Sequence, residues 1–183
     1  MKKQLINYET LLKVTRAMSR SKVPEEVVQL TVKSVKEALD IKGCAIFLED
    51  PESHELSVAA SSGLTEEYLN KGPVSSEHSI GESFKDGPVA IYDVSDDPRI
   101  QYPEAAKKEG IASILSVPIV IGGNVIGAMR VYTAEPWECT LEDVNFVLAL
   151  AQMSGILIEM CRLYQGQKEY IDVLTTMKDA RDM

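Results

Sequence analysis

The 183-residue chain is poor in the side chains that most often carry chemistry, with two histidines, three cysteines and one tryptophan. Cys44, Cys139 and Cys161 are widely spaced and form no CxxC or CxxH pair. Zinc sites and disulfide frameworks usually need clustered or even-numbered cysteines. We therefore expect no metal site and no cofactor. We interpret Cys44 and Cys161 as small buried hydrophobes, and we expect Cys139, in a polar loop, to be the accessible one.

Positive charge and long apolar runs are also scarce. Nineteen lysines and arginines stand against 28 aspartates and glutamates, which gives a net charge of −9. An acidic surface repels phosphate backbones, and the sequence has no basic patch that would offset this. No run approaches the roughly 20 apolar residues that span a bilayer, and the first residues do not form a signal peptide. We expect a cytoplasmic protein that binds neither nucleic acid nor membrane.

The composition, 45% hydrophobic and 26% charged, is that of an ordinary globular protein with room for one domain. Periodicity and turn residues divide the chain into helices and strands. The final helix is expected to begin at a capping box made by Thr140 and Asp143. The predicted helices cover residues 4–20, 24–40, 65–72, 102–110 and 141 almost to the end, and the predicted strands cover 44–50, 55–61, 88–94 and a hairpin between 110 and 133.

The hairpin, "GIASILSVPIVIGGNVIGAMRVYT", is the most informative segment. A two-residue loop at Gly122-Gly123 or at Gly123-Asn124 suits its glycines, and both registers give the same two faces. Because both faces are largely apolar, we expect the hairpin to lie at the centre of a sheet covered on both sides. One predicted face holds Leu115, Val117, Ile119, Ile121, Ile126, Ala128, Arg130 and Tyr132, and the other holds Ile114, Ser116, Pro118, Val120, Val125, Gly127, Met129 and Val131.

Three segments in order, "DVSDDPR", the hairpin and "TLEDVNFVLALAQMSGILIE", resemble the signature of GAF domains over about residues 20 to 165. The resemblance implies an α+β fold with a central antiparallel sheet of about six strands. It implies terminal helices on one face, and short helices and loops over a small-molecule pocket on the other. The expected divisions are an N-terminal helix over 1–20, a GAF domain over 21–165 and an extension of the last helix over 166–183.

The specialised motifs of this family are not assembled. The Asn-Lys…Phe…Asp-Glu set of cyclic-nucleotide members is missing. No cysteine lies between Cys44 and Cys139, where bilin-binding members and free methionine sulfoxide reductases carry theirs. Haem-binding members use a histidine, and here His54 falls in a turn while His78 precedes the lid segment "SIGESFKDG". No nucleophile–base pair is visible either, so we expect no enzymatic activity.

Arg130 is the chemical anomaly of the predicted sheet, because a guanidinium among apolar strands is costly unless it is paired. Cyclic-nucleotide members of the resembled family carry an acid at this position. One interpretation is a fork that binds a ligand carboxylate or phosphate. The other is an internal pair with Asp93 or Glu104, or a stem that reaches water. The further lining residues predicted from the same face or from family position are Tyr132, Leu115, Val117, His78, Phe84, Tyr92, Asp93, Tyr102, Glu104 and Ser113.

The last predicted helix is long enough to carry a signal out of the domain. An apolar residue recurs every three or four positions between Leu150 and Leu174, past the expected end of the domain. Such a helix favours a partner helix, so we expect a homodimer through the terminal helices; the alternative is a tail that frays after Tyr164. The functional prediction is a sensory module that binds a small, possibly anionic ligand and signals through a dimeric helical bundle to a separate output protein. The alternative is a dimerisation or scaffolding domain with a collapsed pocket.

Overall fold

The structure is a computed structural model that describes residues 8–50, 52, 55–72, 74–75 and 87–181. The predicted helices and strands are present within this part of the chain, most with ends shifted by a few residues, and the strand predicted over 88–94 is shorter. The helices are α1 (Tyr8–Met18), α2 (Pro24–Leu39), α3 (Glu66–Leu69), α5 (Pro103–Glu109) and α6 (Leu141–Arg181), and the strands are β1 (Gly43–Glu49), β2 (Glu55–Ser62), β3 (Val74–Ser75), β4 (Val89–Ile91), β5 (Ser113–Ile121) and β6 (Asn124–Thr133).

The strands form one sheet in the order β3-β2-β1-β6-β5-β4, and each neighbouring pair is antiparallel. The β5–β6 hairpin therefore lies in the middle, with β1 on one side and β4 on the other, as predicted. The two-residue strand β3 had no sequence signal. The expected α+β class with an antiparallel sheet is confirmed.

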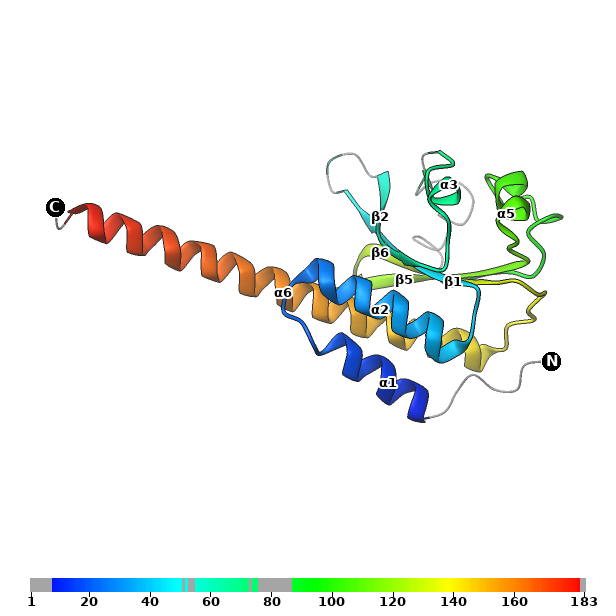
Figure 1. The fold of residues 1–183 in the computed structure, drawn as a ribbon, viewed down its shortest axis with the longest axis horizontal. Helices are drawn as coiled ribbons and strands as arrows, with labels where there is room; N and C mark the ends of the chain where they lie inside the picture. Colours follow the sequence, from blue (N-terminus) through cyan, green and yellow to red (C-terminus); the bar gives the residue numbers. More distant parts are fainter. Residues whose placement is uncertain (1–7, 51, 53–54, 73, 76–86, 182–183) are drawn as a thin grey trace.

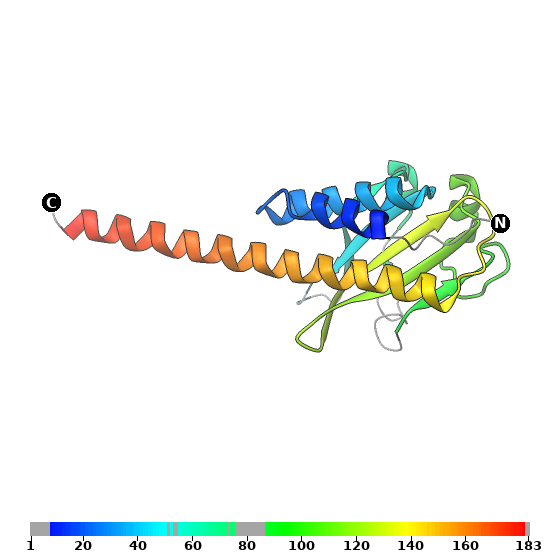
Figure 2. The ribbon, with the colours of Figure 1, turned by 90° about the horizontal axis from the view of Figure 1, so that it is seen from below.

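Helices cover the sheet unequally. Figure 1 shows α1, α2 and α6 on one face, which we call the helix side, and α3 and α5 on the other, which we call the roof side. Figure 2 shows α2 and α6 running along the same face of the sheet. Each side has its own apolar core. The helix-side core includes Met18, Val32, Val35, Leu115, Val117, Met129, Val131, Leu150 and Ile158, and the roof-side core includes Ala45, Phe47, Tyr68, Ile91, Ile114 and Tyr132.

The hairpin turns at Gly122 and Gly123, whose φ angles of +57° and +84° suit glycine. Ile121 pairs with Asn124 across this two-residue loop, which is one of the two predicted registers. The pairing then shifts between Ile119 and Val120, so that Ile126 is an extra residue in β6. This β-bulge advances the rest of β6 by one position against β5.

The bulge exchanges the faces of β6, so the predicted face assignment is wrong. Arg130 lies opposite Ser116, and not opposite Leu115. A shift of one residue moves a whole strand's side chains to the other face. Leu115 and Val117 consequently belong to the helix-side core, while Tyr132 belongs to the roof-side core.

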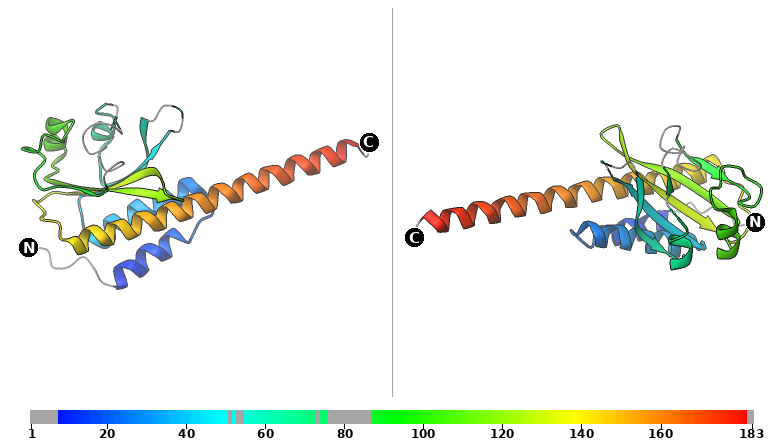
Figure 3. Two further views of the ribbon diagram at one scale, coloured as in Figure 1. Left: turned by 180° about the vertical axis from the view of Figure 1, so that it is seen from behind. Right: turned by 90° about the horizontal axis from the view of Figure 1, so that it is seen from above.

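The long helix α6 starts at the predicted capping box. The Thr140 backbone N–H donates to the Asp143 carboxylate at 3.0 Å, and the Asp143 N–H donates to Thr140 Oγ1 at 3.2 Å. Gly155 allows α6 to approach β5, because a Cβ there would lie 2.7 Å from Ile119 Cγ2. Beyond the sheet α6 continues to Arg181 as one helix (Figure 3). The structure therefore does not support the alternative of a tail that frays after Tyr164.

Among the described helices, the span Leu141–Met177 is long and apolar enough to cross a membrane by length and composition alone. Within the most apolar window of this span, 44% is buried in the fold. The core helix of a soluble protein passes the same test, so the feature is weak evidence for a membrane span.

Candidate functional site

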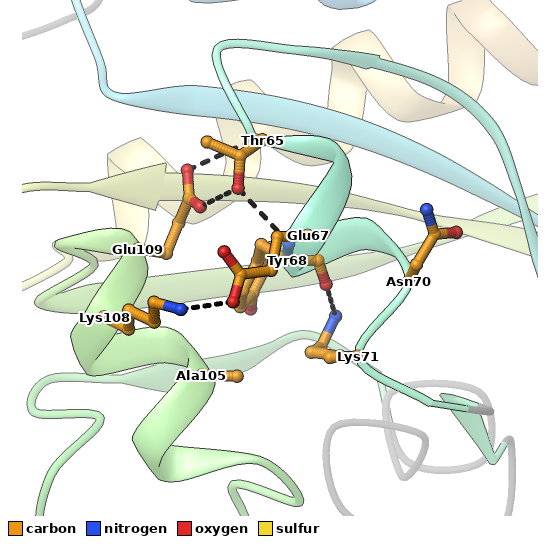
Figure 4. A pocket seen from close by; sticks show the side chains of 8 residues that line it. All are labelled: Thr65, Glu67, Tyr68, Asn70, Lys71, Ala105, Lys108 and Glu109. Carbon is orange, nitrogen blue, oxygen red and sulfur yellow. Dashed lines mark hydrogen bonds and ion pairs between the residues drawn. The ribbon is translucent and has the colours of Figure 1, made fainter.

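A cleft of about 410 Å³ opens between α3 and α5 on the roof side (Figure 4). Helix α3 begins after Thr65, whose side chain accepts a hydrogen bond from the Tyr68 N–H. Helix α5 begins at Pro103 and ends at Glu109, and the residue that caps it, Gly110, has a φ of +75°. These short helices hold their side chains over the sheet. The cleft is lined by Thr65, Glu67, Tyr68, Asn70, Lys71, Ala105, Lys108 and Glu109.

Glu109 ties the two walls of the cleft together. Its carboxylate accepts hydrogen bonds from the Thr65 N–H at 3.2 Å and from Thr65 Oγ1 at 2.5 Å, and Lys42 Nζ lies 3.4 Å away. Burial raises the pKa of Glu109, but the Thr65 hydrogen bonds and the Lys42 charge outweigh it and hold the pKa below its usual value. An ion pair between Lys108 and Glu67 joins the outer rims. The charge of Glu109 is thus already matched.

Lys71 lines the cleft. Its Nζ donates to the Tyr68 carbonyl at 3.0 Å and lies 3.9 Å from the centre of the Tyr68 ring and 6.0 Å from that of Tyr102. Burial lowers the pKa of Lys71 to about 8; the nearby charge of Arg130 adds to this effect, and the charge of Glu109 opposes it. The ion pairs found among the described residues do not include Lys71.

Arg130 lies deeper, on the central strand β6, with only 5% of its surface exposed. Its guanidinium carbon is 4.6 Å from the centre of the Phe47 ring. Its Nε is buried and has no hydrogen-bond partner, and the ion pairs within the described part of the chain do not include it. Burial raises the pKa of the nearby Tyr132 to about 12, although the charge of Arg130 and a hydrogen bond between the two side chains work against this rise. The roof side therefore holds two cations, Arg130 and Lys71, among aromatic rings.

The family model for the GAF domain matches residues 21–159, which is most of the chain. The chain belongs to the GAF domain family. GAF domains are sensory and regulatory modules. No curated protein is similar enough in sequence to count as a relative.

Solved GAF structures share the fold. The GAF domain of an Acinetobacter phosphoenolpyruvate-protein phosphotransferase is 18% identical, with a TM-score of 0.73 over 91% of this chain and 99% of that one. The corresponding domain from Coxiella burnetii is 22% identical, with a TM-score of 0.76 over 86% and 95%. The free methionine-R-sulfoxide reductase of Neisseria meningitidis, solved with its substrate, is 18% identical, with a TM-score of 0.71 over 87% and 95%.

Within this GAF domain, the predicted residue Arg130 is one of the two cations, and two further predicted lining residues, Tyr132 and Tyr102, lie close to them. Arg130 and Tyr132 share the roof side, and the Tyr132 ring meets the Tyr68 ring edge-on at 6.0 Å. Tyr102 precedes α5, and its ring faces Lys71. The prediction that Leu115 and Val117 share a face with Arg130 is wrong, because the bulge at Ile126 shifts β6 by one residue and moves Arg130 to the opposite face.

The other predicted residues lie elsewhere. The buried Ser113 hydroxyl donates to the Tyr92 carbonyl at 2.5 Å and accepts from the Trp137 N–H at 2.8 Å, so it ties loops together. The Tyr92 side chain itself is 57% exposed. Glu104 is exposed on the first turn of α5. His78, and Phe84 in the lid segment that follows it, lie outside the described residues.

Neither acid proposed as an internal partner is paired with Arg130 in the described structure. Asp93 accepts hydrogen bonds from the N–H and hydroxyl of Ser95, at 2.9 and 2.5 Å, and these lower its pKa. Asp97 binds Arg99 in the same loop. Asp93 and Asp97 thus stabilise their own loop through local contacts, which is common for aspartates in turns.

The cysteines have ordinary structural positions and are all free. Cys44 and Cys161 are buried, as predicted, whereas Cys139 is half-buried and less accessible than expected. Burial raises the pKa of all three thiols, that of Cys139 to about 12 with a contribution from Asp143. Among the described residues, no group of three or more potential ligands could hold a metal ion.

Sequence reasoning missed Phe47, Tyr68, Lys71 and Glu109. Phe47 and Ala45 alternate on one face of β1, but the apolar run "CAIFLED" does not say which face is the roof side. Lys71 follows a one-turn helix and reads as a solvated residue. Its position above β6 depends on contacts between segments far apart in the sequence.

Proposed function

We propose that this GAF domain is a sensory module that binds a small anionic ligand at Arg130 and signals through a dimeric helical bundle. The observation that carries the proposal is the buried Nε of Arg130, which has no hydrogen-bond partner. An unsatisfied buried polar group costs about 1–3 kcal/mol, and more when it is charged. A ligand carboxylate or phosphate would remove that cost with charge-assisted hydrogen bonds.

The alternative function is a dimerisation or scaffolding domain whose pocket has collapsed. The open cleft beside Lys71 and the lack of an ion pair to Arg130 among the described residues favour the sensor. In a collapsed pocket, an internal acid would be expected to neutralise Arg130. Asp93 and Glu104, the acids predicted from the sequence as possible partners, are exposed and form no ion pair with Arg130 in the described structure.

The dimer is supported by the pattern of exposed apolar residues on α6. From Ile156 they recur in alternating steps of four and three residues, which is the heptad spacing of a coiled coil. Gln167 is the one polar residue in this seam. A single helix that projects alone is marginally stable in water, and a second copy supplies a matching seam. The seam consists of Ile156, Met160, Leu163, Gln167, Tyr170, Leu174 and Met177, while the charged residues Arg162, Lys168, Glu169 and Asp172 fall outside it.

The site and α6 are joined by packing. Met129 and Val131, on either side of Arg130 in the chain, belong to the helix-side core. Ile119 of β5 contacts α6 at Gly155. A ligand bound to Arg130 therefore interacts with a sheet that packs against α6. If the ligand binds one position of the strands more tightly than another, its binding shifts the position of the helix as well.

We take the chain to be a cytoplasmic, non-enzymatic module that acts on a separate output protein. The raised pKa values of its three cysteines disfavour a cysteine nucleophile, because the reactive form of cysteine is the thiolate.

The test is a calorimetric titration of the purified protein with a panel of small carboxylates and phosphates. Wild type is expected to bind at least one of them, and Arg130→Met is expected to lose that binding while it keeps its helical circular dichroism. Binding that survives in Arg130→Met would contradict the proposed site. Light scattering on the same samples measures the dimer.

A further inference from the structure

The residues around Arg130 also indicate the charge of the ligand, on the basis of the proposed function above. We infer that the site takes a small dianion, such as a phosphate monoester or a dicarboxylate, whose two negative charges are shared between Arg130 and Lys71. The two cations come from different elements, β6 of the sheet and the segment after α3.

Both cations keep donors for a ligand. The Nε–H of Arg130 is buried and unused. The ammonium of Lys71 carries three N–H groups, of which one donates to the Tyr68 carbonyl at 3.0 Å. The Tyr68 ring covers another side of the ammonium at 3.9 Å. Lys71 and Tyr68 line the cleft, and the Tyr68 ring meets the ring of Tyr132, which shares the roof-side face of β6 with Arg130. In the proposed complex the ligand contacts Lys71 in the cleft and reaches Arg130 past this pair of rings.

Among the described acids near the cleft, Glu109 acts on Lys71 through its charge, which raises the pKa of that lysine, but its direct contacts are with other groups. Glu109 is matched by Thr65 and Lys42, and its side chain is only 4% exposed. Glu67 is paired with Lys108 at the rim. The charge of Arg130 is close enough to Lys71 to depress the pKa of that lysine, so the two cations repel each other. A monoanion would leave one positive charge unmatched, whereas a dianion removes the repulsion.

The size of the cleft and the aromatic rings near the two cations restrict the ligand further. A volume of about 410 Å³ is at the lower end of small-molecule sites. The Tyr68 ring lines the cleft beside Lys71, the Tyr102 ring lies 6.0 Å from the Lys71 ammonium, and the Phe47 ring contacts Arg130. A compact metabolite with an acidic end group fits this volume better than an extended polymer does.

The competing interpretation is that Lys71 merely rests on Tyr68 and extends toward water. In that case Lys71 would add nothing to the charge preference of the site. The two interpretations differ in how a Lys71 variant treats ligands of different charge.

The experiment titrates four probes into wild type, Lys71→Met, Arg130→Met and the control Lys107→Met. Methyl phosphate and succinate are dianions near neutral pH, and dimethyl phosphate and butyrate are their singly charged counterparts. Lys107 is an exposed lysine of α5 that does not line the cleft, so its variant makes the same charge change elsewhere. The comparison of the phosphate pair with the carboxylate pair shows whether the site prefers a phosphate monoester or a dicarboxylate.

Wild type and Lys107→Met are expected to bind at least one dianion about tenfold more tightly than its counterpart. Lys71→Met is expected to lose this preference but to keep monoanion binding, and Arg130→Met is expected to bind neither. If wild type shows no preference, or if Lys71→Met retains it, the dianion inference is wrong even though Arg130-dependent binding leaves the proposed function intact. If no probe binds wild type at millimolar concentration, both are contradicted.

Discussion

The guanidinium carbon of Arg130 lies 4.6 Å from the centre of the Phe47 ring, on the face of the sheet away from the long helices. A cation over an aromatic face gains about 0.5–2 kcal/mol. That contact holds the side chain in place, but it accepts no hydrogen bond from Nε. The fold therefore keeps a buried positive charge whose hydrogen bonding is incomplete, and this is the feature that a ligand would satisfy.

Replacement of Arg130 should stabilise the ligand-free protein. In Arg130→Met an apolar side chain of similar length replaces an incompletely paired buried cation, so we expect the free energy of unfolding to rise by about 1–3 kcal/mol. Urea denaturation measures this, with Lys107→Met expected within about 0.5 kcal/mol of wild type. A loss of stability greater than about 1 kcal/mol in Arg130→Met would show that the arginine is already satisfied in the fold.

Lys71 should make stability depend on pH in the alkaline range. Its pKa in the fold is about 8, below the ordinary 10.5, so the unfolded chain binds more protons between these values. The free energy of unfolding attributable to Lys71 therefore rises as pH increases above about 8. Buried thiols and tyrosines act in the opposite direction at higher pH, so the quantity to measure is wild type minus Lys71→Met. A difference that stays constant with pH would contradict the assignment.

Loss of the Glu109 charge should separate the walls of the cleft. We expect Glu109→Gln to destabilise the protein by about 1–3 kcal/mol, because a buried, charge-assisted contact with Thr65 and Lys42 is weakened. The pKa of Glu109 is depressed in the fold, so its contribution is present above the ordinary value of 4.5 and is lost as pH falls below it. Glu104→Gln, an exposed change on the same helix, serves as the control. Equal effects of the two variants would rule out this role.

Two glycines should respond to alanine in opposite directions. A Cβ on Gly127 would lie 2.2 Å from the Phe47 carbonyl oxygen, so Gly127→Ala must displace the β1–β6 pair and is expected to cost about 3 kcal/mol or more. Gly166 on α6 has open space around it, so Gly166→Ala is expected to be neutral or to stabilise by up to about 1 kcal/mol. Thermal unfolding of the two variants compares them directly. A tolerated Gly127→Ala would contradict the observed strand pairing.

The seam on α6 should control the oligomeric state. Leu174→Asp places a charge in the seam, and we expect it to convert a dimer into a monomer in light scattering. Thr175→Asp adds the same charge one residue along, outside the seam, and should remain dimeric. Wild type that is monomeric at every concentration would contradict the proposed bundle.

The sequence predicted the elements and the hairpin loop, because periodicity and turn glycines specify these locally. The helices on each face of the sheet were expected from the resemblance to GAF domains. The sequence did not predict the faces of β6. In "NVIGAMRVY" apolar residues occupy both faces, so alternation contains no signal for the bulge at Ile126. The site residues Phe47 and Lys71 were missed for a related reason. They approach Arg130 only through pairing of β1 with β6 and the placement of α3 over the sheet.

Native mass spectrometry of the protein, purified without refolding from the organism that encodes it, tests most directly whether a small anion completes the site at Arg130. We predict a dimer that carries one small acidic molecule per chain, and the same dimer without that molecule when Arg130 is replaced by methionine. A wild-type protein that is free of any small molecule, and that gains none from an extract of acidic metabolites added before the measurement, would contradict the account.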